Sequence, residues 1–241
     1  MGLPFLALPS SIWQRELAEL VHRPRALAIK MLFPVAVAVP LLHSGAPSFY
    51  AAMALTMLLA TMAPLGAGAV MARERAAGLM LRYRLLPGRP RLAGMERMLA
   101  SALVDLLQAA PVLVLVMSSR AAAGAWWAAL WVGTAATLVA GNALGALAST
   151  ITRSPGEVML FVLLPTLPAL YLAGVFTPLA DPVRRTVSLA LPFTYLHDAL
   201  EGALGGAATM PVAQATIGAC MALLGALCLT WLIGRRLMEA G

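Results

Sequence analysis

Residues 125–150 read AWWAALWVGTAATLVAGNALGALAST and contain no charged side chain. Because an α-helix rises about 1.5 Å per residue, this run is long enough to cross a hydrocarbon core of about 30 Å. Five further apolar runs, each near the length of a membrane span, lie at residues 26–42, 49–71, 98–117, 158–176 and 212–234. The sequence therefore predicts an all-α polytopic membrane protein with six transmembrane helices.

The composition of the whole chain agrees with this prediction. Of its 241 residues, 61% are hydrophobic and 11% are charged, and the mean hydropathy is +0.86. Soluble domains use about 45–50% apolar and about 25% charged residues, so an ordinary soluble protein is excluded. We expect residues 1–241 to form a single domain embedded in a lipid bilayer.

The basic residues predict how the chain is oriented. The formal net charge is +7, and the arginines gather in the short breaks between apolar runs. This distribution suits an anionic membrane surface, and we expect no nucleic-acid binding. Of the 17 Lys and Arg residues, only Arg120, Arg184 and Arg185 lie on the side opposite the termini. By the positive-inside rule we expect both termini to be cytoplasmic, in a multi-pass protein of a cell membrane, with a bacterial inner membrane as its location.

Residues 11–23 predict a short amphipathic helix before the first span. A serine followed three residues later by Gln14 is the capping-box pattern of a helix start. Trp13, Leu17 and Leu20 fall on one face of this helix. We expect the helix to lie in the plane of the membrane interface, with its tryptophan at the level of the headgroups.

The connection at residues 72–97 predicts a docking surface on the cytoplasmic side. It reads ARERAAGLMLRYRLLPGRPRLAGMER, with leucines such as Leu81 and Leu85 among the arginines and a break at Pro87-Gly88. We expect a short helix that ends at this break and packs against a partner.

The connection at residues 177–211 predicts short helices on the opposite side of the membrane. Val183, Val187 and Leu191 share one face of a first run, and a second run follows at residues 193–204. Such a segment can re-enter the membrane where its irregular backbone is buried against protein.

The sequence lacks the residues of a nucleotide-binding or catalytic site. A P-loop needs a lysine, and the one lysine of the chain, Lys30, lies inside the first apolar run. His22, His43 and His197 lie on separate segments without metal-ligand spacing, so we interpret each as a surface or interfacial residue. We expect no catalytic residue, metal or cofactor in this chain. If the protein uses ATP, a partner subunit must bind the ATP and magnesium.

Asp105, Gln108 and Asn142 are the polar residues within the apolar runs for which we consider a role. Asp105 and Gln108 lie one helical turn apart on one face, and Asn142 lies within a GxxxG pattern from Gly141 to Gly145. A carboxylate at this depth costs roughly 2.5–3.5 kcal/mol on insertion scales unless it is protonated, paired or facing water. Two interpretations stay open, a hydrogen-bonded contact with a neighbouring helix or a proton relay through Asp105. The GxxxG pattern predicts close helix packing.

Two groups of residues carry a resemblance to a known family. The first group, in the 72–97 connection, consists of Glu74, Arg75, Gly78, Pro87 and Arg91. The second group, after the fifth apolar run, consists of Phe176, Pro178, Pro192, Phe193 and Tyr195. The order and spacing of these residues resemble those of the ABC-2 type permease family, and the resemblance covers nearly the whole chain. Members of this family are the membrane subunits of type V, exporter-like ATP-binding cassette transporters. Two positions depart from the family pattern: Glu201 replaces a common arginine, and Gly78-Leu79-Met80 replaces Gly-Thr-Leu.

The resemblance implies the permease subunit of an ATP-driven exporter. Such a subunit forms the substrate pathway as a homodimer or a paralogous heterodimer and pairs with separate ABC ATPase subunits. The resemblance further implies that the helix at residues 11–23 is a connecting helix. It also implies that the 72–97 segment, including Leu81 and Leu85, is coupled to the ATPase.

The substrate and the energy source leave alternatives open. The apolar spans fit a lipid, a glycan-lipid or a hydrophobic drug-like substrate. A permease of the haem-exporter type and a proton-coupled secondary transporter that uses Asp105 are the alternatives. An intramembrane lipid enzyme is a third class, for which the sequence offers no catalytic constellation.

Overall fold

The computed structural model describes residues 12–14, 22, 24–79, 90–119, 121–152 and 154–239 of the chain. These residues form helices joined by turns, with no strand among them, as the apolar runs predict. Some of the residues named above for the connecting helix and the coupling segment lie outside the described residues, namely Leu17, Leu20, Leu81, Leu85 and Pro87.

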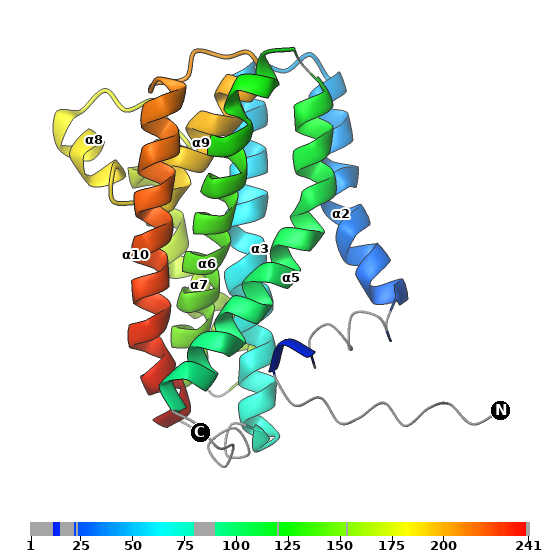
Figure 1. Cartoon of the computed structure of the whole chain (residues 1–241), viewed down its shortest axis with the longest axis vertical. Helices are drawn as coiled ribbons and strands as arrows, with labels where there is room; N and C mark the ends of the chain where they lie inside the picture. The colour runs from blue at the N-terminus through cyan, green and yellow to red at the C-terminus, as the bar shows by residue number, and fades with distance from the viewer. Residues whose placement is uncertain are drawn as a thin grey trace.

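The long helices of the described chain lie side by side in one bundle (Figure 1). They are α2 (Pro24–His43), α3 (Ser48–Ala76), α5 (Pro90–Ser119), α6 (Trp127–Ile151), α7 (Pro155–Leu172) and α10 (Val212–Glu239). The short elements are the 3-10 helix η1 (Ala121–Trp126), α8 (Pro182–Ser188) and α9 (Pro192–Ala203). Helix α6 is central, in contact with α3, α5, α7, α9 and α10.

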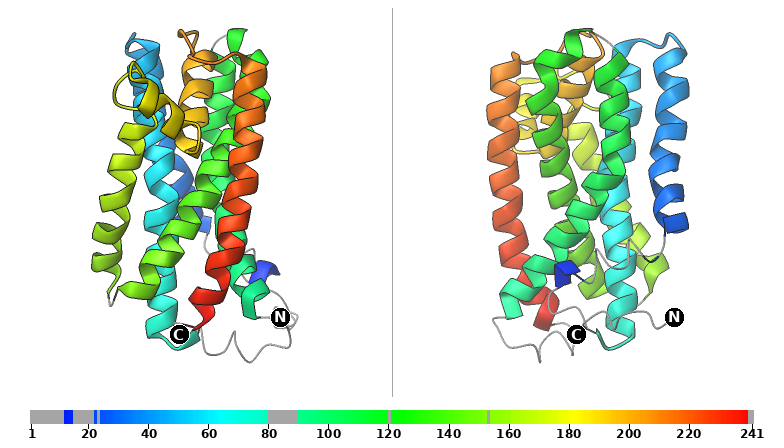
Figure 2. Two further views of the ribbon diagram at one scale, coloured as in Figure 1. Left: turned by 90° about the vertical axis from the view of Figure 1, so that its left-hand side faces the viewer. Right: turned by 45° about the vertical axis from the view of Figure 1, so that its right-hand side comes forward.

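The two ends of the bundle differ in construction. Helix α10 ends at what we call the C-terminal end, while α8 and α9 lie at the opposite end, which we call the α9 end (Figures 1 and 2). Figure 2 shows α7 and α2 at two edges of the bundle, with α9 tucked between the long helices.

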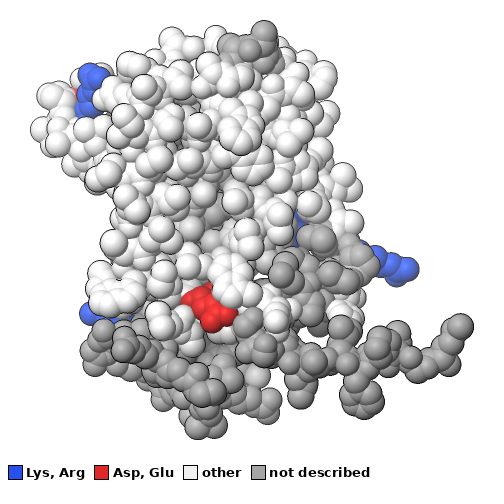
Figure 3. Space-filling view, viewed as in Figure 1, with Lys and Arg blue, Asp and Glu red and all other residues white. Residues whose placement is uncertain are grey.

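Five helical stretches are long and apolar enough to cross a membrane, namely α3, α5, α7, α10 and η1 together with α6. Within α2, the described apolar stretch Ala28–His43 is shorter than these five. Large apolar side chains such as Leu160 and Leu164 on α7 are exposed on the outside of the bundle. In Figure 3 the charged side chains lie at the upper left and in the lower half of the view, down from about mid-height, and the surface between these two groups is uncharged. The chain is therefore a multi-pass membrane protein, and five of the six predicted spans are supported.

The GxxxG pattern brings α6 against α3, as predicted. A Cβ atom added at Gly141 would lie 2.8 Å from Pro64 Cδ, and one added at Gly145 would lie 2.9 Å from the backbone nitrogen of Gly68. No side chain fits at such distances, so only glycine lets the two backbones approach this closely.

Helix α9 is buried along almost its whole length. Every residue from Phe193 to Ala203 is buried among α3, α6, α10 and η1. A Cβ atom at Gly218 of α10 would overlap the ring of Tyr195, and one at Gly202 would overlap the ring of Trp126. Small residues on both sides of the contact therefore make room for the aromatic rings that hold α9 in place.

Two boundaries differ from the prediction. Helix α3 continues to Ala76 and α5 begins at Pro90, so the expected connection at residues 72–97 narrows to 77–89. The fifth apolar run continues to residue 176, but α7 ends at Leu172 because Gly174 takes a φ of 84°. The backbone nitrogen of Val175 then donates to the carbonyl oxygen of Leu170 at 3.1 Å, a closure typical of a glycine-terminated helix.

Candidate functional site

A buried ion pair joins α3 and α5 at the C-terminal end. Arg97 Nε donates to Glu74 Oε2 at 3.0 Å, and Arg97 Nη2 donates to Glu74 Oε1 at 3.1 Å. The two side chains are only 2% and 8% exposed, respectively. This is the two-pronged geometry in which a guanidinium and a carboxylate hold each other most rigidly. The pair joins α3 to α5 close to the connection at residues 77–89.

Arg75 ties the same turn of α3 to the end of α6. Its guanidinium donates to the carbonyl oxygen of Ser149 and, at 3.2 Å, to that of Thr152. These carbonyls belong to the last turn of α6 and the residue after it, where a helix has no backbone donors left to offer them. Gly78, with a φ of 71°, then ends α3 and turns the chain away. Within five residues of the chain, Glu74 thus pairs with α5, Arg75 bonds to the end of α6, and Gly78 ends α3.

An apolar cluster packs beside this ion pair. It brings together Ile12, Met71, Met98, Ile233 and Leu237, and the partly buried Trp13 rests on it. The described part of the predicted connecting helix is thus in contact with the C-terminal end of the bundle. Arg91 is the second residue of α5, on the far side of the 77–89 connection from Glu74.

The polar residues within the spans meet between α5 and α6. Asn142 Nδ2 donates to Asp105 Oδ2 at 2.8 Å and to the carbonyl oxygen of Leu138 at 2.9 Å. All three predicted polar residues, Asp105, Gln108 and Asn142, are buried. The sequence left open whether Asp105 forms a hydrogen bond with a neighbouring helix or relays protons. The Asp105–Asn142 bond is a hydrogen bond of the first kind, and the neighbouring helix is α6.

At the α9 end, side chains form hydrogen bonds with the backbone of the turns on either side of α9. Thr194 Oγ1 donates to the carbonyl oxygen of Ser188 at 2.7 Å, and the Tyr195 hydroxyl donates to that of Leu189 at 2.6 Å. Asp198 accepts bonds from the backbone nitrogens of Thr209 and Met210 at 2.9 and 2.8 Å. These bonds pair non-helical backbone within the protein, which the predicted re-entry into the membrane would require.

The other residues predicted in this segment occupy separate positions. Pro192 is the first residue of α9, and Phe193 is buried in a cluster against which Phe176 packs. Pro178 lines a cavity under α9. Val183 and Val187 of α8 are exposed, whereas Leu191, predicted on the same face, packs against the cluster that contains Phe193.

His197 contradicts the prediction of a surface or interfacial residue, because it is buried at 5% exposure. Its Nδ1 lies 3.4 Å from Thr56 Oγ1, and its ring meets Phe49 edge to face at 5.2 Å between centroids. Removal from water lowers the pKa of His197 from 6.5 to about 4, against an opposing effect of a hydrogen bond to the backbone of Ala52. The sequence around His197 does not indicate its burial, because the residues that cover its ring belong to α3.

The cavity under α9, which we call the α9 cavity, has a volume of about 340 Å³. Its polar lining includes His197, Asp198 and Glu201, and its apolar lining includes Phe49 and Pro178. Burial raises the pKa of Asp198, partly offset by its bonds to Thr209 and Met210. Burial and the neighbouring Asp198 charge raise the pKa of Glu201.

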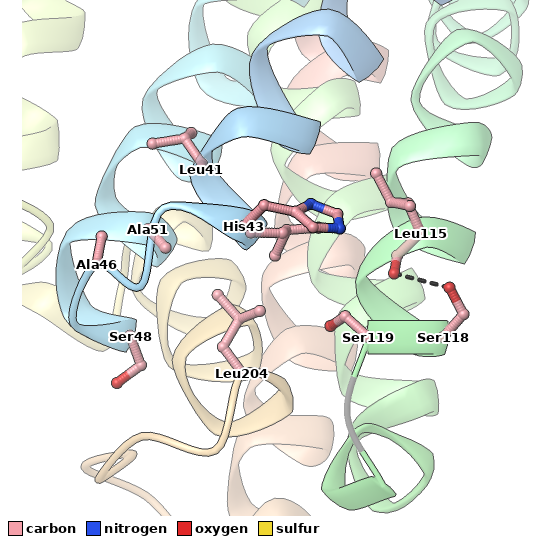
Figure 4. A pocket seen from close by; sticks show the side chains of 10 residues that line it. Leu41, His43, Ala46, Ser48, Ala51, Leu115, Ser118, Ser119 and Leu204 are labelled. Carbon is pink, nitrogen blue, oxygen red and sulfur yellow. Dashed lines mark hydrogen bonds between the residues drawn. The ribbon is translucent and has the colours of Figure 1, made fainter.

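A second cavity at the same end, of about 450 Å³, lies between the end of α2 and the end of α5 (Figure 4). The His43 ring points from α2 toward Leu115 of α5. His43 Nδ1 lies 2.9 Å from the carbonyl oxygen of Val39, and Ser118 donates to that of Leu115 at 3.0 Å. These polar groups already pair within their own helices, so the hollow offers little to a polar ligand.

Other residues that shape these ends also escaped the sequence-based prediction. In the sequence Arg97 is one of many basic residues, and its buried pairing depends on how α5 packs against α3. Arg184 donates to the carbonyl oxygens of Tyr171 and Thr177 and lies 4.3 Å above the Tyr171 ring. The adjoining Asp181, which caps α8 ahead of an N1 proline, is the one local signal that the sequence offered for this turn.

Comparison with known proteins bears on the identity of the chain. A search of curated proteins found no match to this sequence. A family model does match, over residues 39–234, and its description is ABC-2 family transporter protein. The matched range covers most of the chain, from the end of α2 almost to the end of α10. The chain therefore belongs to the ABC-2 family of transporter proteins, whose members are membrane permeases that partner with an ABC ATPase subunit.

Proposed function

We propose that this chain is the permease subunit of an ATP-driven exporter, forms the substrate pathway as a dimer, and is driven by separate ATPase subunits through residues 77–89. ATP and magnesium would be bound by those subunits. Both termini would be cytoplasmic, which makes the C-terminal end of the bundle the face that meets the ATPase. The substrate would be a lipid, a glycan-lipid or a hydrophobic drug-like molecule.

The observation that carries the proposal is a pair of contacts beside the connection at residues 77–89, one buried and one part-buried. Glu74 bonds to Arg97 across α3 and α5, and Arg75 bonds to the end of α6. A push on the connection would therefore reach three long helices together. An ion pair buried in this way adds little net stability, but it holds one geometry, which is what a lever requires.

Helix α2 would supply the sixth span. It runs beside α5 and α3, and Ile29, Leu32 and Phe33 are exposed in the manner of lipid-facing side chains. Its 20 residues correspond to about 30 Å of helix, and Lys30 is close enough to one end to extend to the headgroups. An even number of spans would leave both termini on one side.

The contact between Asp105 and Asn142 favours a packing role over a proton relay. Asp105 accepts a hydrogen bond from a side chain on the neighbouring helix, which is an ordinary way to hold a buried carboxylate in a bundle. We therefore expect transport to persist in Asp105→Asn, whose remaining carbonyl oxygen can still accept from Asn142.

The direct test is purification of the tagged full chain from its native membrane in mild detergent, followed by mass spectrometry and an ATPase assay. We expect a stoichiometric P-loop ATPase and vanadate-sensitive hydrolysis. In reconstituted vesicles, Pro87→Ala should reduce transport per ATP hydrolysed, while Arg73→Gln, an exposed neighbour of Glu74, should not. A purified chain that transports without an ATPase, and loses transport in Asp105→Asn, would replace this proposal with proton coupling.

A further inference from the structure

The α9 cavity contains a buried nitrogen atom that no part of the described chain engages. His197 lines the cavity at 5% exposure, and its Nε2 has no hydrogen-bond partner among the described residues. Buried polar atoms are nearly always paired, so an unpaired ring nitrogen in a residue that lines a cavity requires an explanation.

The other side of the His197 ring determines what Nε2 can accept. Thr56 Oγ1 donates its proton to the carbonyl oxygen of Ala52 at 2.7 Å, so toward His197 Nδ1, 3.4 Å away, it can act only as an acceptor. This arrangement places the ring proton of a neutral histidine on Nδ1. Nε2 is then a lone-pair acceptor, and it needs a donor from the cavity.

The charge of the cavity points to the same kind of ligand. Glu201 Oε2 lies 4.0 Å from His197 Nε2, too far for a hydrogen bond between the two. Asp198 adds a second carboxylate, but both of its oxygens are occupied by Thr209 and Met210. Among the described residues that line the cavity there is no Lys or Arg. The site therefore offers one carboxylate and one neutral acceptor to an incoming donor.

The remaining lining is apolar and leaves room for a small organic body. Phe49, Pro178 and Leu179 form this wall, and the volume of about 340 Å³ lies within the range of small-molecule pockets. We propose that the α9 cavity binds a small primary ammonium compound, whose N–H groups bond to Glu201 and His197 while its apolar body packs on Phe49 and Pro178. One nitrogen can serve both acceptors, because each hydrogen bond spans about 2.9 Å and the acceptors lie 4.0 Å apart.

A metal ion fits this cavity less well. Among the described residues, no group of three His, Cys, Asp or Glu side chains is arranged to hold a metal. The inference goes beyond the proposed function, since binding at this site requires neither the ATPase nor transport, and its test measures binding alone.

The test uses the full chain in lipid nanodiscs, titrated with benzylamine and followed by saturation-transfer NMR, with empty nanodiscs as the baseline for partitioning. Two probes of similar shape separate the contributions. Benzyl alcohol lacks the charge, and benzyltrimethylammonium keeps the charge but has no N–H group. We expect saturable binding of benzylamine at neutral pH and at least tenfold weaker binding of each analogue, because a hydrogen bond to a charged group is worth about this factor.

Two variants place the site. Glu201→Gln and His197→Gln should each weaken benzylamine binding about tenfold or more. Glu157→Gln at the start of α7 and His43→Gln beside the second cavity are the matched controls, and both should bind as the wild type does. If either cavity variant fails to fold, as judged by its thermal unfolding, the comparison of the three probes on the wild-type chain still decides.

Three results would overturn the proposal. The first is equal affinity for benzylamine and benzyl alcohol, which would mean partitioning into an apolar hollow. The second is unchanged affinity in both folded cavity variants. The third is displacement of benzylamine by micromolar zinc through His197 and Glu201, which would make the cavity a metal site instead.

Discussion

At the scale of single residues, the ion pair between Glu74 and Arg97 shows how burial changes the meaning of a charge. In the sequence alone, Arg97 is one of several arginines in a basic connection. Its side chain is nevertheless 2% exposed and held by two hydrogen bonds. Removing one partner would leave the other charge buried without compensation, which costs far more than the pair contributes.

We predict that Arg97→Met and Glu74→Leu each lower the free energy of unfolding by about 3–5 kcal/mol. The double variant should recover most of this loss, because two apolar side chains can replace a buried pair. Denaturant or thermal unfolding of the purified chain measures both effects. Arg73→Met, at an exposed position of the same turn, is the control and should unfold as the wild type does. Additive losses in the double variant would contradict this account of the pair.

His197 predicts a pH dependence of stability. Its pKa is about 4 in the folded chain against 6.5 in an unfolded one, so between these values the unfolded state binds the extra proton. Stability therefore falls as the pH drops from about 6.5 toward 4, and above 6.5 this histidine has no effect. The raised pKa values of Asp198 and Glu201 act in the opposite direction, because their ionisation on raising the pH destabilises the fold.

The contribution of His197 can be isolated by difference. We expect the gap in thermal midpoint between the wild type and His197→Gln to change steadily between pH 6.5 and 4 in favour of the variant, which cannot be protonated. A gap that stays constant with pH would mean that His197 is protonated without cost.

At the scale of elements, glycine positions decide which helices touch. We predict that Gly145→Ala destabilises the bundle by about 1–3 kcal/mol, because the new Cβ would press into the backbone of α3 at Gly68 and Pro64. Gly66→Ala, on α3, has open space around it and should be neutral or slightly stabilising, as alanine is in a helix. Thermal unfolding of the two variants compares them directly.

The docking of α9 provides a second test of this kind. Gly218→Ala should loosen α9 by pushing on the Tyr195 ring, whereas Gly225→Ala, two turns further along α10, meets nothing within 4 Å. Hydrogen exchange of the amides in α9 should rise in the first variant and stay unchanged in the second. Equal protection in both variants would mean that Tyr195 can turn aside without moving the helix.

At the scale of the whole molecule, the distribution of charge predicts the orientation of the bundle in the membrane. With Cys220 and Cys228 replaced by alanine, a single cysteine at Arg185 in α8 should react with a membrane-impermeant maleimide added to intact cells. A single cysteine at Arg73 should react only after the membrane is opened. Labelling of both positions in intact cells, or of neither, would contradict the proposed placement of the termini.

The sequence alone was sufficient for the properties that depend on each segment by itself. The apolar runs determine an all-helical membrane protein, because a helix alone satisfies its backbone within one segment in lipid. The GxxxG pattern determines a close helix contact, and the resemblance in motif order identifies the family, which the match at residues 39–234 confirms. The positions of the connections also follow from local composition, although the one predicted at residues 72–97 spans only 77–89 in the structure.

The properties that depend on which segments meet could be seen only in the folded molecule. Nothing near Arg97 in the sequence indicates Glu74 as its partner, and nothing near His197 predicts that α3 covers it with Phe49 and Thr56. Burial and pKa depend on neighbours supplied by distant helices, and packing between helices is what brings them together. For the same reason, the α9 cavity could not be predicted from the sequence, although each residue that lines it is visible there.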